Sequence, residues 1–249
     1  MNAAPSFVVT GASGGIGRAI AAHLGSIGHV VNLDPAPPPD AEPSFPRLHD
    51  LVGDAGDASA ARAAAELAER HGPLTGWVNN AAIFRDAGLA TSTAEQVGSL
   101  IARNLDLAVV GCVVAVQHFL AHDRPGAIVN VSSHQAQRPV RGALPYATAK
   151  AAVEGLTRAA AVDHGPDGIR VNAVALGSIT TDRYEQYRRE HPDADRQMAA
   201  VHPIGHIGRP LDVAQAVAFL LSEEAAFISG VVLPVDGGRA AFGPDPEAV

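Results

Sequence analysis

A tyrosine and a lysine four positions apart have the clearest chemical potential in the chain. Tyr146 and Lys150 would share one face of a helix, because residues four apart lie one turn from each other. An unperturbed tyrosine has a pKa of about 10 and is a poor base near neutrality, but a lysine ammonium beside it favours the phenolate and lowers that pKa. Ser133, thirteen positions before Tyr146, offers a hydroxyl that could hold a substrate oxygen. Together they could pass a proton to or from an alcohol or ketone.

Taken alone, a Tyr-x-x-x-Lys pair is usually an exposed helix pair, so a second motif must support it. A glycine-rich segment over residues 10–17 follows a short apolar run and opens a helical pattern. Gly11 would permit a tight turn, Gly15 would let the backbone approach a pyrophosphate, and Gly17 would let helix and strand pack closely. Such a segment can be a simple flexible loop, but its place between a first strand and a first helix favours a dinucleotide site.

An aspartate closes the second expected strand, seventeen positions after Gly17. The Asp34 carboxylate could accept hydrogen bonds from an adenosine ribose and would repel a 2′-phosphate. No lysine or arginine occurs in the loop before Arg18, nor directly after Asp34. This pattern favours NAD over NADP as cofactor; the alternative is a solvated aspartate at a strand end.

Short apolar runs alternate with longer helical patterns along the whole chain. Strands are expected at residues 7–9, 30–33, 45–49, 74–79, 127–132, 169–175 and 231–235, and helices at 16–27, 58–70 with Asp57 as N-cap, 97–120, 146–163 and 211–221. This alternation requires crossover connections and therefore a parallel sheet covered on both faces. The expected fold is one α/β domain over residues 1–249, a doubly wound parallel sheet of about seven strands. The prolines at 35 and 37–39 are expected in a surface loop, and the polar segment 181–206 is a candidate lid.

Composition excludes several classes of protein. The 249 residues are 47% hydrophobic and 18% charged, an ordinary globular balance. A formal net charge of −8 disfavours a nucleic-acid partner, and the single cysteine, Cys112, cannot form an intrachain disulfide. Neither a signal peptide nor a membrane span is evident, so a cytoplasmic location is expected.

With these motifs the chain resembles the short-chain dehydrogenase/reductase family, in its short single-domain branch, over nearly its whole length. The resemblance rests on residues 10–17, 54–57, 79–82, 133, 146, 150, 170–172 and 236–238, with Ala82 in place of the usual glycine. It implies a Rossmann-type fold and a fourth catalytic residue, Asn104, which in the family breaks its helix and anchors a water and the lysine. The cofactor-binding residues it implies are Gly11, Ala12, Ser13, Gly14, Gly15, Ile16, Gly17, Asp34, Asp54, Ala55, Asn80, Ala81, Ala82, Tyr146, Lys150, Gly177, Ile179 and Thr181.

One departure from the family pattern follows the sixth expected strand. The family has Pro-Gly there, whereas this chain has Leu176-Gly177. Leucine frees φ and restores a backbone N–H, so a looser turn is expected beside the nicotinamide. Ile179 and Thr181 still match positions that hold the nicotinamide carboxamide in the family.

Contacts to substrate are less clearly indicated. His134 could face the substrate cavity or support its neighbours, and Arg138 and Arg141 could meet an anionic substrate or be merely solvated. His202 and His206 are four apart, but a proline and a glycine lie between them, which makes a helical metal site improbable. No metal is expected.

The sequence thus predicts an NAD-dependent oxidoreductase that interconverts a secondary alcohol and a ketone, with Tyr146 as general acid/base. The alternative is a catalytically silent NAD-sensing protein on the same fold; the intact Ser133, Tyr146 and Lys150 argue against it. A homotetramer is expected, with a dimer as the second choice, because two helices carry apolar or small residues on more than one face. These residues are Val109, Val110, Val113, Val114, Ala149, Ala152, Ala159 and Ala160.

Overall fold

A computed structural model describes residues 3–36 and 46–243. It contains seven strands and seven α-helices in alternation. The strands are β1 (Ser6–Thr10), β2 (His29–Asp34), β3 (Leu48–Val52), β4 (Leu74–Asn79), β5 (Gly126–Ser133), β6 (Ile169–Leu176) and β7 (Val232–Val235). The helices are α1 (Gly15–Gly25), α2 (Ala58–His71), α3 (Ala94–Ala121), α4 (Leu144–His164), α5 (Asp182–Glu190), α6 (Ala194–Ala200) and α7 (Pro210–Leu221).

All neighbouring strands pair in parallel, in the order β3-β2-β1-β4-β5-β6-β7. The chain winds outward in one direction from β1 and in the other from β4, so the winding reverses between these two strands. A crevice for ligands forms at such a reversal, outside the carboxyl ends of the strands. The doubly wound parallel sheet expected from the sequence is confirmed, and the glycine-rich segment follows β1 at the reversal.

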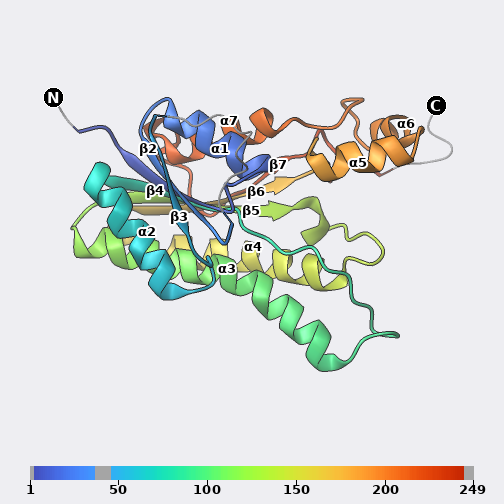
Figure 1. Cartoon of the computed structure of the whole chain (residues 1–249), viewed down its shortest axis with the longest axis horizontal. Coiled ribbons are helices and arrows are strands. Elements are labelled where there is room, and N and C mark those ends of the chain that lie inside the picture. The colour runs from blue at the N-terminus through green and yellow to red at the C-terminus, as the bar shows by residue number, and fades with distance from the viewer. Residues whose placement is uncertain (1–2, 37–45, 244–249) are drawn as a thin grey trace.

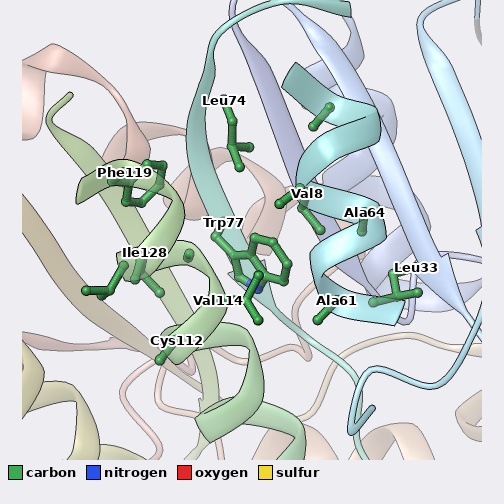
Figure 2. Packing of buried hydrophobic residues seen from close by; sticks show 14 of the residues in the cluster. Val8, Leu33, Ala61, Ala64, Leu74, Trp77, Cys112, Val114, Phe119 and Ile128 are labelled. Atoms are coloured by element: carbon green, nitrogen blue, oxygen red, sulfur yellow. The ribbon is translucent and has the colours of Figure 1, made fainter. Parts of the chain in front are cut away.

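Each face of the sheet is covered by its own helices. Helices α2, α3 and α4 lie on one face and α1 and α7 on the other (Figure 1). Trp77 of β4 is fully buried in the first layer, where it packs among side chains of the sheet, α2 and α3 (Figure 2). Few aromatic residues are needed because rows of alanine, such as Ala61, Ala64 and Ala68 of α2, let the helices approach the strands closely.

Most expected boundaries lie within two residues of those in the structure, whereas those of the third strand and the start of α3 differ by three residues. The third strand begins at Leu48 rather than Phe45, which lies outside the described residues, because β3 pairs with β2 from Val30 opposite Leu48 onward. Helix α3 begins at Ala94 rather than Val97, because Thr93 and Gln96 form a capping box that starts the helix one turn earlier. The expected N-cap of α2 is confirmed, since the Asp57 carboxylate accepts a hydrogen bond from the Ser59 N–H at 2.8 Å.

Helix α3 is long and apolar enough to cross a membrane by length and composition alone. It nevertheless packs against α2, α4 and β4, and Phe119 and Ala115 are fully buried. Core helices of soluble proteins pass the same test, so this helix is accounted for by its packing.

The candidate lid contains a pair of short helices. Helices α5 and α6 pack on each other beyond the end of β6 (Figure 1). Residues 201–206 after α6 form turns, as the proline and glycine in that stretch predict.

Candidate active site

The loop between β1 and α1 is shaped by glycines that cannot be replaced without a clash. Gly11 has φ +68°, and a Cβ there would lie 2.9 Å from the Ala81 Cα. A Cβ at Gly17 would lie 2.2 Å from the Gly11 carbonyl oxygen. These two glycines therefore bring the start of α1 against the loop and against the segment after β4, as expected for the first turn of a dinucleotide-binding fold.

The same loop has open space where a ligand would lie. A Cβ at Gly14 or Gly15 would meet nothing within 4 Å. Gly14 is the N-cap of α1, no side chain caps the helix, and its first turn holds no acidic residue. The first N–H groups and the positive end of the helix dipole are thus available to an anion. The loop fits the pyrophosphate of a dinucleotide cofactor.

Polar side chains from β4 brace this loop. The Asn80 side chain donates hydrogen bonds to the carbonyl oxygens of Thr10 and Gly11, both at 2.9 Å. In return, the Thr10 hydroxyl accepts from the N–H groups of Asn80 and Ala81, both at 3.0 Å. The Asn80 side chain is therefore occupied in holding the loop. Only backbone groups next to Asn80 remain for contact with a cofactor.

Asp34 lies at the end of β2, directly against the loop. Its carboxylate accepts from the Ser13 N–H and the Ala36 N–H, each at 3.1 Å. The Ser13 hydroxyl donates to the Ala36 carbonyl at 2.6 Å, which ties the strand end to the loop a second time. The strand end thus presents a negative charge beside the loop, where the ribose of an adenosine would lie in this fold.

In the segment after β3, the side chain of Asp54 is already engaged. It pairs with Arg103 of α3 and accepts from the Gly56 N–H at 2.8 Å. These contacts lower the pKa of Asp54, the Gly56 bond most strongly. Ala55 is buried in the core, so it could contribute only backbone groups.

Ser133, Tyr146 and Lys150 come together where β5 ends and α4 begins. Ser133 is the last residue of β5, and its hydroxyl accepts from the Gln135 N–H at 3.2 Å. The Lys150 ammonium is buried, donates to the Val131 carbonyl at 2.6 Å, and lies 5.5 Å from the centre of the Tyr146 ring. The structure therefore brings together the three residues whose spacing suggested acid–base chemistry.

The pKa of Tyr146 is raised, whereas the sequence analysis predicted that Lys150 would lower it. Burial raises it to about 12, partly offset by a hydrogen bond from Ser133 and by the charge of Arg183. Burial also lowers the pKa of Lys150 to about 8. The predicted lowering by Lys150 was wrong for the free protein, because the ammonium is directed at the Val131 carbonyl and desolvation dominates.

The sequence comparisons agree with this geometry. A family model described as enoyl-(acyl carrier protein) reductase matches residues 11–240. The 3-oxoacyl-[acyl-carrier-protein] reductase of Pseudomonas aeruginosa is 36% identical over 93% of this chain and 95% of its own. The inactive 2-(S)-hydroxypropyl-CoM dehydrogenase 2 of Xanthobacter autotrophicus is 39% identical over 76% of this chain and 84% of its own.

The chain belongs to the short-chain dehydrogenase/reductase family. A solved structure of a putative 2-deoxy-D-gluconate 3-dehydrogenase from Agrobacterium tumefaciens with bound NADP has a TM-score of 0.84 to it, at 29% identity, and covers 96% of this chain and 98% of its own. As a member of this family, the chain is a nicotinamide-dependent oxidoreductase that acts on alcohol or ketone groups.

The helix break that the family resemblance implied at Asn104 does not occur in the described residues. Helix α3 continues unbroken through this residue. Its buried side chain accepts from the Ile83 N–H at 2.8 Å and donates to the carbonyls of Ile83 and Leu100, each at 3.1 Å. In the described part of the chain these bonds tie the segment after β4 to α3 and do not reach Lys150. The bond to the Leu100 carbonyl, four residues earlier, is made without interrupting the helix.

Leu176 replaces the family's proline without interrupting β6. It pairs with Ser133 on one side and Val235 on the other, so β6 extends one residue beyond the predicted end. Its carbonyl accepts from His134 Nδ1 at 3.1 Å. A Cβ on the following Gly177 would lie 2.8 Å from the Asp236 Cα, so this position requires glycine.

His134 is buried beneath this turn. Because Nδ1 donates to a carbonyl, Nε2 carries the lone pair, and among the described residues it has no hydrogen-bond partner. Burial, and then the charge of Arg239, lower the pKa of His134 and favour its neutral form. The contacts place His134 as a support of the Gly177 turn, the second of the two roles the sequence left open.

The next residues connect the turn to the lid. Ile179 is buried and forms a parallel bridge with Gly208. Thr181 is the N-cap of α5, whose hydroxyl accepts from the Tyr184 N–H at 3.4 Å.

Two residues beside Tyr146 were missed by sequence reasoning. The Phe84 ring lies 4.8 Å from the Tyr146 ring, and the Arg183 guanidinium lies 5.3 Å from the Phe84 ring. Arg138, expected near the substrate, instead donates to the Phe242 carbonyl at 3.1 Å, and Arg141 is exposed. The arginine-rich lid was the available signal for Arg183, but the spacing of residues does not reveal which of its arginines turns inward.

Proposed function

We propose that this dehydrogenase transfers a hydride between NAD and a secondary alcohol or ketone, with Tyr146 as the general acid/base. The observation that supports this most is the triad at the end of β5. The phenol of Tyr146 is hydrogen-bonded by Ser133, and the buried ammonium of Lys150 lies one helical turn away. A base, a hydrogen-bond donor for an oxygen and a cation lie together at the crevice of a Rossmann-type fold.

In the direction of oxidation, the Tyr146 phenolate takes the hydroxyl proton as the C–H bond gives up its hydride. In the direction of reduction, the phenol returns that proton to the carbonyl oxygen. The nicotinamide supplies the hydride acceptor or donor when the cofactor is bound. Ser133 holds the substrate oxygen by a hydrogen bond, and the nearby charge of Arg183, which lowers the pKa of Tyr146, favours the phenolate.

The experiment that tests this role compares Tyr146→Phe with Tyr187→Phe, a matched change on the lid helix α5. Loss of the phenol should lower kcat by about 10²–10⁴-fold, the contribution of a positioned acid–base group. Binding of the dinucleotide, followed by fluorescence titration, should stay within a few-fold of the parent. Retained turnover in Tyr146→Phe would refute the assignment.

The rival function is a dinucleotide sensor without turnover. One 39%-identical relative is described as inactive, so membership of the family does not guarantee activity. A sensor has no need of a buried lysine beside a tyrosine, and burying an ammonium is costly. A screen of secondary alcohols with NAD⁺ separates the two: a hydride-transfer absorbance change supports the enzyme, whereas dinucleotide binding with no turnover supports the sensor.

The preference for NAD rests on Asp34. Its carboxylate is fixed by the Ser13 and Ala36 N–H groups at the end of β2, so a 2′-phosphate on the ribose would meet a negative charge. The ratio of kcat/KM for NAD⁺ to that for NADP⁺ should exceed one, and Asp34→Ser should lower it. Asp50→Asn, which removes a nearby charge that instead bonds Asn32, is the control. Equal efficiency of the parent with both cofactors would contradict the preference.

A homotetramer remains our proposal for the assembly, with a dimer as the second choice. Val113 of α3 and Val162 of α4 are large apolar side chains exposed at 46% and 76%. Helices α3 and α4 pack side by side, so these side chains belong to one helical layer that a second copy could cover. Sedimentation at micromolar concentration should give about four chains per particle; a 25.5 kDa species would refute the proposal.

A further inference from the structure

Three histidines meet at the edge of the sheet where the strands begin, opposite the crevice. His29 is the first residue of β2, His49 lies in β3, and His71 is the last residue of α2. One ring nitrogen from each can be chosen so that all three lie within 4.8 Å of one another. The catalytic group, by contrast, follows the carboxyl end of β5.

Strand register and helix periodicity bring these side chains together. His29 points to the same face of β2 as Val31, two residues on, and Val31 is paired with His49 in β3. That face is covered by α2, through Ala64 and Ala68. His71 follows Ala68 by three positions, so it continues the buried stripe of α2 at the helix end.

The rings are close enough to share an ion. His29 Nδ1 and His49 Nε2 are 3.2 Å apart, near the separation of about 3.4 Å that two nitrogen ligands have around a tetrahedral Zn²⁺. The His71 ring is parallel to that of His49, with centroids 3.5 Å apart. His71 is exposed, so its ring has room to turn its nitrogen toward the other two.

Two of the three histidines have a lowered pKa. Burial, and then the proximity of His71, lower the pKa of His29 and of His49. Arg47 lowers the pKa of His29 further, whereas Asp50 acts against the lowering at His49. The geometry of the three rings, and not these shifts, is the basis for a shared ligand.

A second cluster of possible metal ligands is less suited to bind an ion, because its carboxylate is already paired. Glu69, His118 and His122 also lie within ligand distance of one another. Both Glu69 oxygens, however, accept from the Arg124 guanidinium at 2.9 Å, and one of them also from the Leu74 N–H. A metal ion there would have to displace an arginine, so this cluster serves as an internal control.

We propose that His29, His49 and His71 form a binding site for a divalent transition-metal ion of the Zn²⁺ class. Three imidazoles and an open fourth position for water suit such an ion and not the oxygen-seeking Mg²⁺ or Ca²⁺. The ion would join the edge strand β3 to β2 and to the end of α2. Because it lies at the opposite edge of the sheet from Tyr146, the ion would take no part in the chemistry at the crevice.

The test is calorimetric titration of Zn²⁺ into untagged, chelator-treated protein, with thermal unfolding measured in parallel. One zinc ion per chain should bind, and the melting temperature should rise. His29→Gln and His49→Gln should each weaken zinc binding by more than about tenfold and abolish the rise. His118→Gln should change neither, and Mg²⁺ should not bind. If either strand variant fails to fold, the exposed His71→Gln replaces it.

Co²⁺ gives a spectroscopic check that does not depend on stability. Bound at imidazole nitrogens, it should produce visible absorption bands that His49→Gln removes and His122→Gln leaves. The proposal is overturned if the parent protein binds no zinc. It is equally overturned if zinc binding is lost in His118→Gln and kept in His29→Gln and His49→Gln.

Discussion

The glycine-rich loop after β1 and the candidate lid after β6 lie at the same edge of the sheet but are held by different kinds of contact. The loop is fixed by backbone groups and buried polar side chains, among them the bonds between Asn80 and Thr10. The lid helix α5 buries none of its residues. The loop cannot accept an added methyl group at its closely packed glycines. Helix α5, by contrast, is not packed tightly enough to prevent it from moving.

The contacts of the lid illustrate this. Arg188 pairs with Glu185 at 2.6 Å and with Asp195 at 3.7 Å, but exposed ion pairs of this kind contribute only about 0–1 kcal/mol. Two residues of the lid are exceptions, since Ala194 and His202 are buried. His202 donates to the Met198 carbonyl at 2.6 Å and accepts from the Ser178 N–H at 3.2 Å. Among the described residues of the lid, His202 is therefore a buried polar anchor, and the exposed ion pairs add little.

The largest expected effect is at Gly17. A Cβ there would lie 2.2 Å from a backbone oxygen and 2.9 Å from the Ala12 Cα. Gly17→Ala should therefore cost about 3 kcal/mol or more of unfolding free energy and abolish dinucleotide binding. Gly14→Ala is the matched control, because a Cβ at Gly14 meets open space and its φ of −162° suits any residue. Urea unfolding measures both, and equal stabilities would contradict the contrast between loop and lid.

A smaller effect is expected at the anchor of the lid. His202→Ala removes both hydrogen bonds and leaves the Ser178 N–H without its acceptor, which should cost about 2 kcal/mol. His206→Ala, in the same segment but exposed, should cost less than about 0.5 kcal/mol. If the two variants unfold at the same denaturant concentration, His202 does not anchor the lid.

Arg183 connects the lid to the chemistry, and its expected effect is smaller still. Its charge lowers the pKa of Tyr146, so Arg183→Gln should raise that pKa further. Oxidation needs the phenolate, whose fraction grows with pH, so the profile of kcat/KM for alcohol oxidation should move to higher pH. At a fixed pH on the rising limb the rate should fall roughly twofold, as for removal of an exposed charge. Arg189→Gln, on the same helix, should leave the profile in place.

The sequence predicts the loop well because each of its roles is a backbone requirement that only one residue type meets. Gly11 and Gly17 are needed wherever a helix and a strand approach this closely, and their spacing shows it. The polarity of residues 181–206 marks the segment as a candidate lid. It does not show where the helices of that segment lie or which side chains face the crevice. Which of its arginines lies near Tyr146 depends on how α5 packs, so Arg183 could not be singled out from the sequence.

The structure differs from the sequence predictions at two further residues, Tyr146 and Asn104. The direction of the pKa shift at Tyr146 depends on the balance between burial and the position of the Lys150 ammonium, which residue spacing does not give. The helix is also unbroken at Asn104, whose side chain bonds Ile83 and Leu100. Both are questions of where a side chain points.

The smallest expected effect concerns motion of the lid when ligands bind. Few buried contacts hold α5, so its amide hydrogens should exchange rapidly in the free protein. Dinucleotide and substrate together should slow exchange over 181–200, because closure excludes water from the crevice. Exchange near His202 should be slow in both states, since that residue is already buried. Equal exchange at α5 with and without ligands would show that the lid does not close, and the contrast with the loop would then lie in packing alone.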